Sequence, residues 1–388
     1  MVQQHAEVIG GGIGGLTAAT ALAQRGWQVR LHERDHEIRA IGAGIYMWGN
    51  GLASLEALGL FDRAVVGAHV GQTLESRDHR NRTVEAIEIN RPGRARVYTI
   101  LRERLIDTLV SGAKAAGVEI ITDSEILRAE PDGTIVAADG RTARADLVVA
   151  ADGVNSRIRD HLGLLAERAR MDQGAIRLTV PRSAEFVDPA DAGKYIEYFR
   201  GRRRLLYTPS SAHDLYVALV TETGDEAGTR VPIDVDSWRR SFPHLGALIE
   251  RLDGLPGRWD TFEFVKLRSW SAGRVAVIGD AAHAQPPYLG QGGGCAMMNA
   301  LGLADAVSTL SAGGDIAERL REWESRERPV IEHTQRWSYG LRLVNRIPDA
   351  MRSPVLTVSG RIERLGRSRM AAALSTPTGF DRFAGTRG

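Results

Sequence analysis

Short apolar runs separated by a stretch of small residues dominate the start of the chain. An apolar strand beginning at Glu7 turns through Gly10 to Gly15 and continues as a helix of small residues from Leu16 to Arg25. A second apolar run, from Trp27 to Leu31, predicts another strand that ends at Glu33. A strand, a helix and a strand in this order predict one βαβ unit with parallel strands.

Later in the chain, two regions with alternating, strand-like residues interrupt this pattern of buried strands and helices. We therefore predict an α/β fold in which a Rossmann-like cofactor-binding domain is interrupted by an antiparallel-sheet, substrate-binding domain and followed by helices. The predicted boundaries are residues 1–70, 99–173 and 265–340 for the first domain, 71–98 and 174–264 for the second, and 341–388 for a C-terminal helical segment.

Two features of the predicted antiparallel domain can be placed by residue. Two strands form a hairpin across the turn from Pro209 to Asp214, which sets Arg204 roughly opposite Tyr216. An arginine on a strand is more often solvated, so the pattern alone leaves Arg204 either on the surface or in a site. A helix follows at about 236–252, and Asp236 is its expected N-cap.

The composition is that of an ordinary globular protein: 43% of the 388 residues are apolar, 25% are charged and the net charge is +2. The arginines are scattered among acids rather than grouped into a basic arm, which disfavours nucleic-acid binding. The single cysteine, Cys295, excludes an intrachain disulfide and fits a reducing compartment.

The start of the chain is too short and polar for a signal peptide, and no run of 18 apolar residues could span a bilayer. We therefore expect a cytoplasmic protein without membrane contact. A homodimer is one assembly that the sequence leaves open.

The glycine turn after the first strand has the G-x-G-x-x-G spacing of a dinucleotide site. Gly10 makes the tight turn, Gly12 lets the backbone approach a pyrophosphate, and Gly15 lets helix and strand pack closely. The N–H groups at the helix start can bind the phosphates, and Glu33 can accept both hydroxyls of an adenosine ribose. The sequence therefore predicts a dinucleotide cofactor.

Four further positions and one glycine run could contact a cofactor, although each has a simpler structural explanation. Gly44 lies in a second glycine-punctuated loop, which could meet a flat ligand or merely turn the chain. Arg102 heads a helix, Asp152 ends a buried strand, and Asp280 could be a helix N-cap. Gly290 to Gly294 open another helix, whose N–H groups can face an anion or a polar ring.

Other polar residues near these positions are less distinctive. Ser156, Arg157 and Arg159 form a set suited to sugar or phosphate oxygens. His283 has no second histidine or carboxylate at metal spacing, so no metal site is expected and a structural role is preferred. Cys295, on an apolar helix face, is expected to be buried packing.

Three signals occur in chain order: the glycine turn with Glu33, the stretch Asp152 to Arg159, and Gly279 to His283 followed by Pro287 and the glycine run. Over roughly residues 5–340 they resemble the single-component FAD-dependent aromatic monooxygenases, the group of p-hydroxybenzoate and salicylate hydroxylases. Shorter segments look like the branch that oxygenates and opens 3-hydroxypyridine rings, among them GAGIYMWGNGL at 42–52, RLLYTP at 204–209 and GGGCAMMNA at 292–300.

The resemblance implies FAD as cofactor, NADH or NADPH as a transient electron donor, and molecular oxygen as co-substrate. It makes Glu33 the ribose ligand, and Asp152 a residue that positions FAD and the pyridine nucleotide. Arg204 and Tyr216 would hold the substrate's carboxylate and ring oxygen, and Pro287 would shape the oxygen-reaction site. The remaining expected contacts to FAD are Arg39, Gly44, Arg102, Asp280, Gly290, Gly292 and Gly293.

We therefore expect a monooxygenase that oxygenates a small hydroxylated aromatic or N-heteroaromatic carboxylate, of the 3-hydroxypyridine type, through a flavin C4a-hydroperoxide. Ring opening could accompany this oxygenation. One alternative is a salicylate or hydroxybenzoate hydroxylase, and another is a flavin dehydrogenase or reductase without oxygen transfer. Leu74 stands where the pyridine branch carries a tyrosine, so the substrate is left open.

Overall fold

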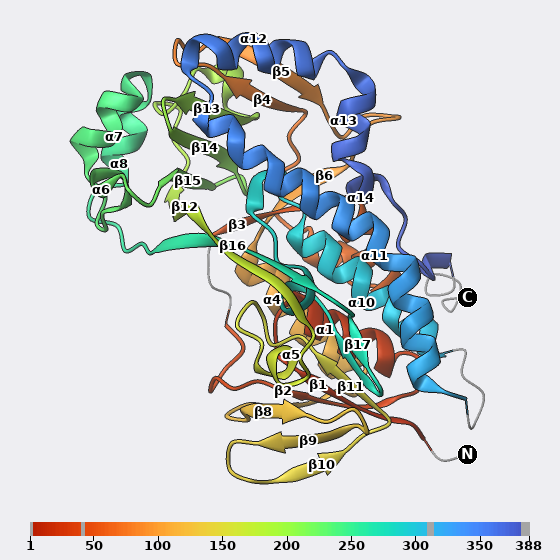
Figure 1. The fold of residues 1–388 in the computed structure, drawn as a ribbon. Coiled ribbons are helices and arrows are strands. Elements are labelled where there is room, and N and C mark those ends of the chain that lie inside the picture. Colours follow the sequence, from red (N-terminus) through yellow and green to blue (C-terminus); the bar gives the residue numbers. More distant parts are fainter. Residues whose placement is uncertain (1–2, 40–42, 309–313, 382–388) are drawn as a thin grey trace.

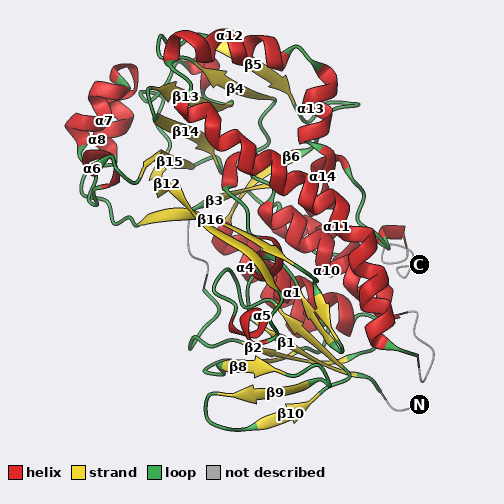
Figure 2. Cartoon of the chain, viewed as in Figure 1, coloured by secondary structure: helices red, strands yellow, loops and turns green. Residues whose placement is uncertain are grey.

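A parallel sheet and a largely antiparallel sheet occupy opposite ends of the molecule (Figure 1). The computed structural model describes residues 3–39, 43–308 and 314–381. Helices cover one face of the parallel sheet and a small three-stranded sheet covers the other, while further helices form a group beside the antiparallel sheet (Figure 2). This arrangement confirms the predicted α/β fold with a second sheet and C-terminal helices.

The parallel sheet has six strands, and its central strands are apolar because both faces are covered. Five strands run parallel and β17 is antiparallel to β18 at one edge. In spatial order the strands are β17 (Ser271–Ala272), β18 (Val275–Val277), β11 (Leu147–Ala150), β1 (His5–Ile9), β2 (Gln28–His32) and β7 (Glu119–Ile121).

The predicted βαβ unit is present as β1, α1 (Ile13–Ala23) and β2. The helix begins three residues earlier than predicted, directly after Gly12, because the last glycines of the turn belong to its first turn. Its small residues are buried between the sheet and α10, which explains why they are small.

Further helices and two small sheets complete this end of the molecule. The helices are α2 (Gly49–Leu58), α3 (Phe61–Ala64), α4 (Arg102–Ala115), α5 (Arg157–His161), α9 (Asp280–His283), η3 (Pro287–Leu289), α10 (Gly292–Ser308) and α11 (Ile316–Leu341). The small sheets are β10 (Thr142–Arg144), β9 (Thr134–Ala137) and β8 (Ile126–Ala129), and β3 (Gly44–Trp48) with β6 (Val97–Leu101).

The second sheet has seven strands, antiparallel except for the parallel pair of β13 and β4. In order they are β16 (Trp259–Leu267), β12 (Leu165–Pro181), β15 (Asp214–Glu222), β14 (Arg203–Pro209), β13 (Tyr195–Arg200), β4 (Thr73–Arg77) and β5 (Thr83–Glu88). The predicted domain boundaries near 173 and 264 fall inside β12 and β16, and the division into domains remains a proposal.

The two faces of this sheet have different partners, as the alternation of side chains along a strand requires. On β14, Leu205 and Tyr207 join a core with Trp238 and Phe242 of the nearby helices. Arg204 and Leu206, on the other face, border a cavity. The helices at this end are η1 (Pro189–Asp191), α6 (Glu226–Thr229), α7 (Val235–Ser241), η2 (Pro243–Leu245) and α8 (Gly246–Arg251).

The helix predicted at about 236–252 is therefore two short helices with a 3₁₀ turn between them. Pro243 lacks the N–H that would continue the first helix, so the chain breaks there. Asp236 is not the N-cap. Asp234 takes that role, and its carboxylate accepts the Ser237 N–H at 2.9 Å.

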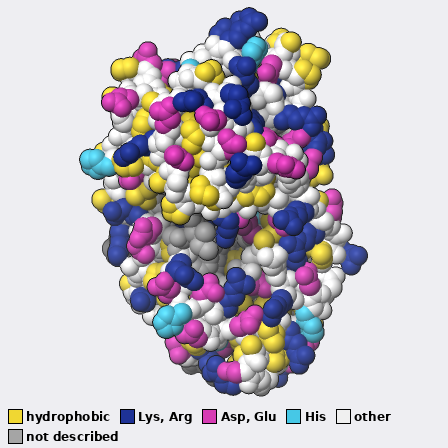
Figure 3. All heavy atoms as spheres, turned by 90° about the vertical axis from the view of Figure 1, so that its left-hand side faces the viewer, with side chains coloured by type: hydrophobic (Ala, Val, Ile, Leu, Met, Phe, Trp, Pro, Cys, Tyr) yellow, Lys and Arg dark blue, Asp and Glu magenta, His cyan; other side chains and the backbone are white. Residues whose placement is uncertain are grey.

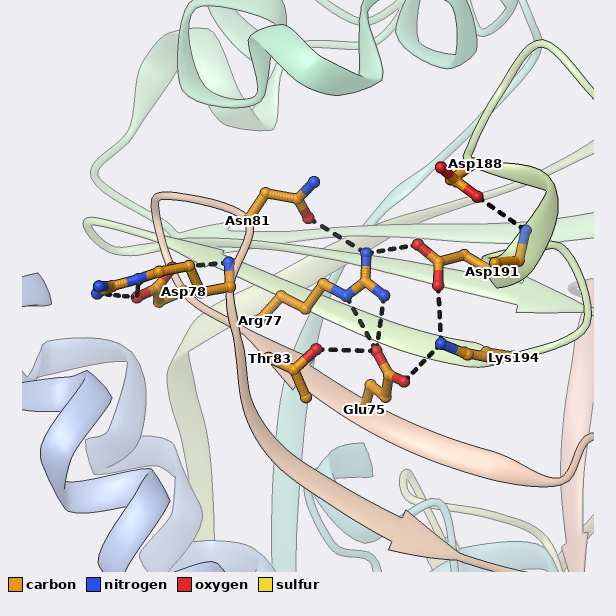
Figure 4. A network of polar contacts seen from close by, with 10 residues as sticks. Glu75, Arg77, Asp78, Asn81, Thr83, Asp188, Asp191 and Lys194 are labelled. Atoms are coloured by element: carbon orange, nitrogen blue, oxygen red, sulfur yellow. Dashed lines mark hydrogen bonds and ion pairs between the residues drawn. The ribbon is translucent and has the colours of Figure 1, made fainter.

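A buried ionic network fixes β4 beside β13 (Figure 4). Arg77 donates two hydrogen bonds to Glu75 and one, at 2.7 Å, to Asp191. Lys194 lies 2.8 Å from each of these two carboxylates. Because Arg77 is only 7% exposed, its charge is held by these partners rather than by water.

After α11, the chain crosses to the antiparallel sheet and returns, in η4 (Arg342–Arg346), α12 (Asp349–Gly360), α13 (Glu363–Arg369) and α14 (Ala371–Leu374). Figure 1 shows α12 lying along β4 and β5. Basic and acidic side chains are interspersed over the face seen in Figure 3. Among the described residues, no helix is both long and apolar enough to cross a membrane.

Candidate active site

Four of the predicted cofactor residues meet at one edge of the parallel sheet. Gly10 follows β1, Glu33 follows β2, Asp152 lies two residues beyond β11, and Asp280 lies three residues beyond β18. The carboxyl ends of parallel strands share one edge, which is where α/β sheets bind ligands. The edge therefore brings together residues that are widely separated in the sequence.

The glycine turn is shaped by close backbone approaches that only glycine permits. Gly10 has a φ of +103°, and a Cβ there would collide with the Ala151 carbonyl. A Cβ on Gly15 would collide with the Gly10 carbonyl, whereas one on Gly12 would meet nothing within 4 Å. Gly12 therefore leaves open space in front of the first turn of α1, where backbone N–H groups can receive a phosphate.

The two acids at this edge have different surroundings. Glu33 accepts the Gly11 N–H at 2.8 Å and the Asp35 N–H at 3.1 Å, which fixes its carboxylate beside the glycine turn. Asp152 has a buried Oδ1 without a hydrogen-bond partner among the described residues. Burial raises the pKa of Asp152, although bonds from Ser156 and the backbone oppose this. A buried carboxylate oxygen without a hydrogen-bond partner lowers the stability of the folded state unless a ligand donates a hydrogen bond to it.

Arg102 and Asp280 are electrostatic neighbours across the edge. Burial lowers the pKa of Arg102, with a further contribution from Arg177, while Asp280 acts in the opposite direction. Solvent reaches Asp280, yet the densely packed protein around it raises its pKa, and Arg102 opposes that rise. Asp280 does not cap a helix, because Gly279 is the N-cap of α9.

These features fit FAD. The cradle in front of Gly12, the fixed Glu33 carboxylate and the unpartnered oxygen of Asp152 together offer sites for a pyrophosphate, a ribose and a polar donor. Arg102 and Asp280 would lie along the same ligand.

Three arginines proposed as ligands of the cofactor, or of sugar and phosphate oxygens, have protein partners in the structure. Arg39 is exposed and forms an ion pair with Glu37, next to residues 40–42, which the structure does not describe. Arg157 pairs with Glu125 at the surface. Arg159 is fully buried, where it donates to Asp160 and to main-chain carbonyls. The interpretation of Arg159 as a phosphate or sugar ligand is therefore wrong, whereas the roles of Arg39 and Arg157 stay predictions.

Ser156, from the same stretch, caps α5 by accepting the Arg159 N–H, so its hydroxyl also has a structural use. His283 is buried, and burial lowers its pKa to about 4, with an opposing hydrogen bond to Asn299. Burial raises the pKa of Cys295 to about 12. Both residues fit the expected structural roles, since a neutral imidazole and a protonated thiol are suited to packing.

A cavity with an empty volume of about 880 Å³, counted to its open mouth, lies between the antiparallel sheet, η3 and the C-terminal helices. Most of its walls are apolar. The aliphatic lining residues are Leu74, Ile87, Leu206, Leu289, Leu341, Val344, Leu356 and Met370, and the aromatic ones are Tyr46, Trp48, Phe199 and Tyr288. Apolar walls with a few polar groups are typical of sites that bind small molecules.

The charged residues of the cavity form two pairs of opposite sign. Arg204 Nη2 lies 3.3 Å from Glu197 Oε1, and Arg369 Nη2 lies 2.6 Å from Glu85 Oε1. Arg204 is 5% exposed and lies 5.1 Å from the centre of the Tyr288 ring. Burial raises the pKa of Glu197, whereas Arg204 lowers it. The cavity is therefore close to neutral overall.

Tyr216 does not lie opposite Arg204. In the hairpin register Arg204 pairs with Val220, and Tyr216 pairs with Thr208 at the other end. The hairpin forms across the predicted turn from Pro209 to Asp214, but residues that pair lie equally far from a turn, and Tyr216 lies much closer to it than Arg204 does. Tyr216 shares the face of Arg204 but packs against Gly44, where a Cβ would meet both Tyr216 and Ser210.

The loop from Pro287 to the glycine run joins the cavity to the cofactor edge. Pro287 and Gly290 both line the cavity. Gly290 ends η3 with a φ of +61°, and Gly292 and Gly293 open α10. Four of the predicted residues are thus in one segment between the two sites.

Sequence reasoning missed Glu197, Glu85, Tyr288 and Arg369 as lining residues. One signal could have identified Glu197. It lies between the apolar Ile196 and Tyr198 on β13, so its side chain must face away from the helix-covered core, as that of Arg204 does. Glu85 and Arg369 offered no comparable local signal, because 284 residues separate them.

Comparison with known proteins agrees with this geometry. The family model described as "FAD binding domain" matches residues 4–338. The 2-heptyl-3-hydroxy-4(1H)-quinolone synthase of Mycobacteroides abscessus is 48% identical over 373 residues, which are 96% of this chain and 97% of that protein. A Rhodococcus erythropolis protein provisionally named for the same activity is 50% identical over 379 residues, 98% of each chain.

Among solved structures, the tetrameric form of 2-methyl-3-hydroxypyridine-5-carboxylic acid oxygenase has a TM-score of 0.87 and 37% sequence identity, covering 97% of this chain and 98% of that one. Klebsiella pneumoniae HpxO, complexed with FAD and uric acid, has a TM-score of 0.83 and 25% identity, covering 97% and 98%. The chain belongs to the FAD binding domain family and is a FAD-dependent aromatic monooxygenase.

Proposed function

We propose that this protein uses FAD, NADH or NADPH, and molecular oxygen to hydroxylate carbon 3 of a 2-alkyl-4(1H)-quinolone. The observation that carries the proposal is the cavity, whose walls are mainly aliphatic and whose two arginines are each matched by a glutamate. Relatives named as 2-heptyl-3-hydroxy-4(1H)-quinolone synthases support it.

The charge pairing favours a neutral substrate. A carboxylate entering the cavity would compete with Glu197 for Arg204, and with Glu85 for Arg369. Moving an ion from water to an apolar cavity without a free counter-charge is unfavourable. An uncharged bicyclic ring with an alkyl tail instead gains free energy from each apolar group that it buries.

The residues of the chain have distinct tasks in this reaction. Bound FAD, reduced by NADH or NADPH, would supply the activation of molecular oxygen. Arg204 donates to the oxygen on carbon 4 of the ring, and Glu197 accepts the proton that this oxygen carries in the hydroxyquinoline tautomer. The resulting negative charge, held beside Arg204, makes the neighbouring carbon 3 more electron-rich. Apolar walls exclude water that would otherwise compete.

A second candidate substrate is a hydroxypyridine or hydroxybenzoate carboxylate. Arg204 in the cavity and the likeness to 2-methyl-3-hydroxypyridine-5-carboxylic acid oxygenase favour it. The raised pKa of Glu197 also favours it, because a protonated Glu197 would release Arg204 to bind the carboxylate in bidentate fashion.

Turnover of the FAD-loaded enzyme with a substrate panel tests the proposal. The panel contains 2-heptyl-4(1H)-quinolone, a 3-hydroxypyridine carboxylate and 3-hydroxybenzoate, each with NADH and with NADPH. We expect the quinolone to accelerate NAD(P)H oxidation and to gain one oxygen atom by mass. If only the ring carboxylates are oxygenated and the quinolone is not, the result supports the second candidate substrate instead. NAD(P)H oxidation without any oxygenated product would indicate a flavin reductase.

A further inference from the structure

The outer wall of the cavity comes from the C-terminal part of the chain. Leu341 ends α11, Val344 lies in η4, Leu356 lies in α12, and Met370 follows α13. The family model ends at residue 338, so all four side chains lie beyond the region that it describes. These residues are therefore available to adapt the cavity without altering the cofactor edge.

The cavity extends across four neighbouring strands of the antiparallel sheet. Its floor runs from Arg204 on β14 through Glu197 on β13 and Leu74 on β4 to Ile87 on β5. Three strand spacings of about 4.8 Å give this floor a length of roughly 14 Å. The end at β14 is polar and adjoins Pro287. Beyond it, Leu74 and Ile87 add apolar surface, and Ser76 and Glu85 add polar groups on the same two strands.

The far end, at β5, is closed by the C-terminal helices. Arg369 is bonded to Glu85 at 2.6 Å, and both side chains are largely buried. Gly360 packs so closely on Glu85 that a Cβ would lie 2.9 Å from it. Leu356, on the inner face of α12, is 8% exposed. These contacts hold the C-terminal helices in place at this end of the cavity.

We propose that Leu356 sets the length of the substrate's alkyl tail by forming the end wall of the cavity. This inference rests on the proposed function. With the ring between Arg204 and Pro287, a tail at carbon 2 runs past Leu74 and Ile87 and ends against α12. Tails that fill this path are favoured, and longer tails meet Leu356.

A series of 2-methyl-, 2-pentyl-, 2-heptyl- and 2-nonyl-4(1H)-quinolones, assayed with the FAD-loaded enzyme, tests this inference. Leu356→Ala should raise the nonyl-to-pentyl ratio of kcat/KM about tenfold, and Leu356→Phe should lower it by a similar factor. Each substitution opens or closes space for about two methylenes of the tail, and burying two methylenes changes binding by about that much. Leu356→Val, a smaller truncation, should act in the same direction as Leu356→Ala, which protects the test against one poorly folding variant. Product per NAD(P)H consumed is recorded for each substrate.

Val358→Ala is the matched control. Val358 lies on the same helix but is 61% exposed on its outer face, so the chain-length ratio should not change. The methyl compound is an internal control, because it cannot reach the end wall and should be turned over equally by parent and variants. If the Leu356 variants leave the ratio unchanged while the parent hydroxylates the quinolones, the inference fails and the proposed function stands. If the parent hydroxylates none of the series, both fail.

Discussion

At the scale of single residues, Glu197 connects the polar end of the cavity to proton transfer. It can accept a proton only as a carboxylate, and burial raises its pKa, so its active fraction grows as pH rises through that raised value. We expect kcat/KM of the parent to increase over this range. Glu197→Gln should remove the pH-dependent increase and lower the maximal rate about 100-fold, measured as quinolone hydroxylation against pH.

The charges facing Glu197 are Arg204, Glu85 and Arg369, and none of them changes in Glu197→Gln. Glu167→Gln, an exposed change on β12, is the control and should keep the parental pH profile. A rising limb that persists in Glu197→Gln would show that the substrate or another group titrates, and Glu197 would lose its proposed role.

Arg204 also affects the pH profile of kcat/KM, because its charge opposes the effect of burial on the pKa of Glu197. Its positive charge lowers the pKa of Glu197, so Arg204→Ala should move the rising limb to higher pH, whereas Arg204→Lys should keep it nearer the parental position. 2-Heptyl-4(1H)-quinolone should bind the alanine variant more weakly by about 2 kcal/mol, the usual contribution of a hydrogen bond to a charged group. Equilibrium titration of the flavin absorbance measures the affinity. Equal binding by parent and Arg204→Ala would exclude Arg204 from the site.

Local signals in the sequence predicted the residues of the cofactor edge, because each depends on its immediate neighbours. Gly10 and Gly15 lie within one six-residue segment, and Glu33 follows the next strand. The paired charges of the cavity depend instead on contacts between distant segments. Whether an arginine such as Arg159 is a ligand or a buried structural residue also depends on such contacts.

At the scale of elements, β4 depends on the ionic network around Arg77 to pair with β13. Arg77→Ala would leave the carboxylates of Glu75 and Asp191 buried with only Lys194 to balance them. We expect the free energy of unfolding to fall by about 3 kcal/mol, the lower end for a broken buried pair. Urea unfolding followed by tryptophan fluorescence measures the change.

Arg91→Ala gives a matched comparison, since Arg91 pairs with Glu88 at the surface and both side chains are about half exposed. Exposed pairs contribute little, so this variant should unfold close to the parent. If Arg77→Ala were equally harmless, the network would not be what holds β4 in place.

Elements were easier to predict than their pairing. Periodicity located α4, whose Leu105, Leu109 and Ala113 are buried on one face as expected. It could not show that β4 runs parallel to β13, because more than 100 residues separate the two strands. The hairpin of β14 and β15 forms across the predicted turn, and only the pairing expected of Arg204 with Tyr216 was wrong, since residues opposite each other lie equally far from the turn.

At the scale of the whole molecule, cofactor binding and folding stability should be linked through Asp152. A carboxyl whose pKa is raised in the folded state destabilises that state at higher pH, so the cofactor-free protein should lose stability as pH rises from about 4 through the raised value. The Asp152→Asn variant lacks this titration. Without FAD at pH 7 it should therefore be at least as stable as the parent.

With FAD the order should reverse. A ligand at 100 times its Kd stabilises the folded state by about 2.7 kcal/mol, and a tenfold weaker affinity removes about 1.4 kcal/mol of that gain at fixed FAD. If the orphaned Oδ1 of Asp152 receives a donor from the cofactor, Asp152→Asn should gain less from FAD than the parent does. Melting temperatures with and without FAD measure both effects, and Asp253→Asn, at an exposed position, is the control. Asp152→Asn could instead be less stable than the parent without FAD and yet be stabilised by FAD as much as the parent is. That result would show that Asp152 supports its own turn and does not contact the cofactor.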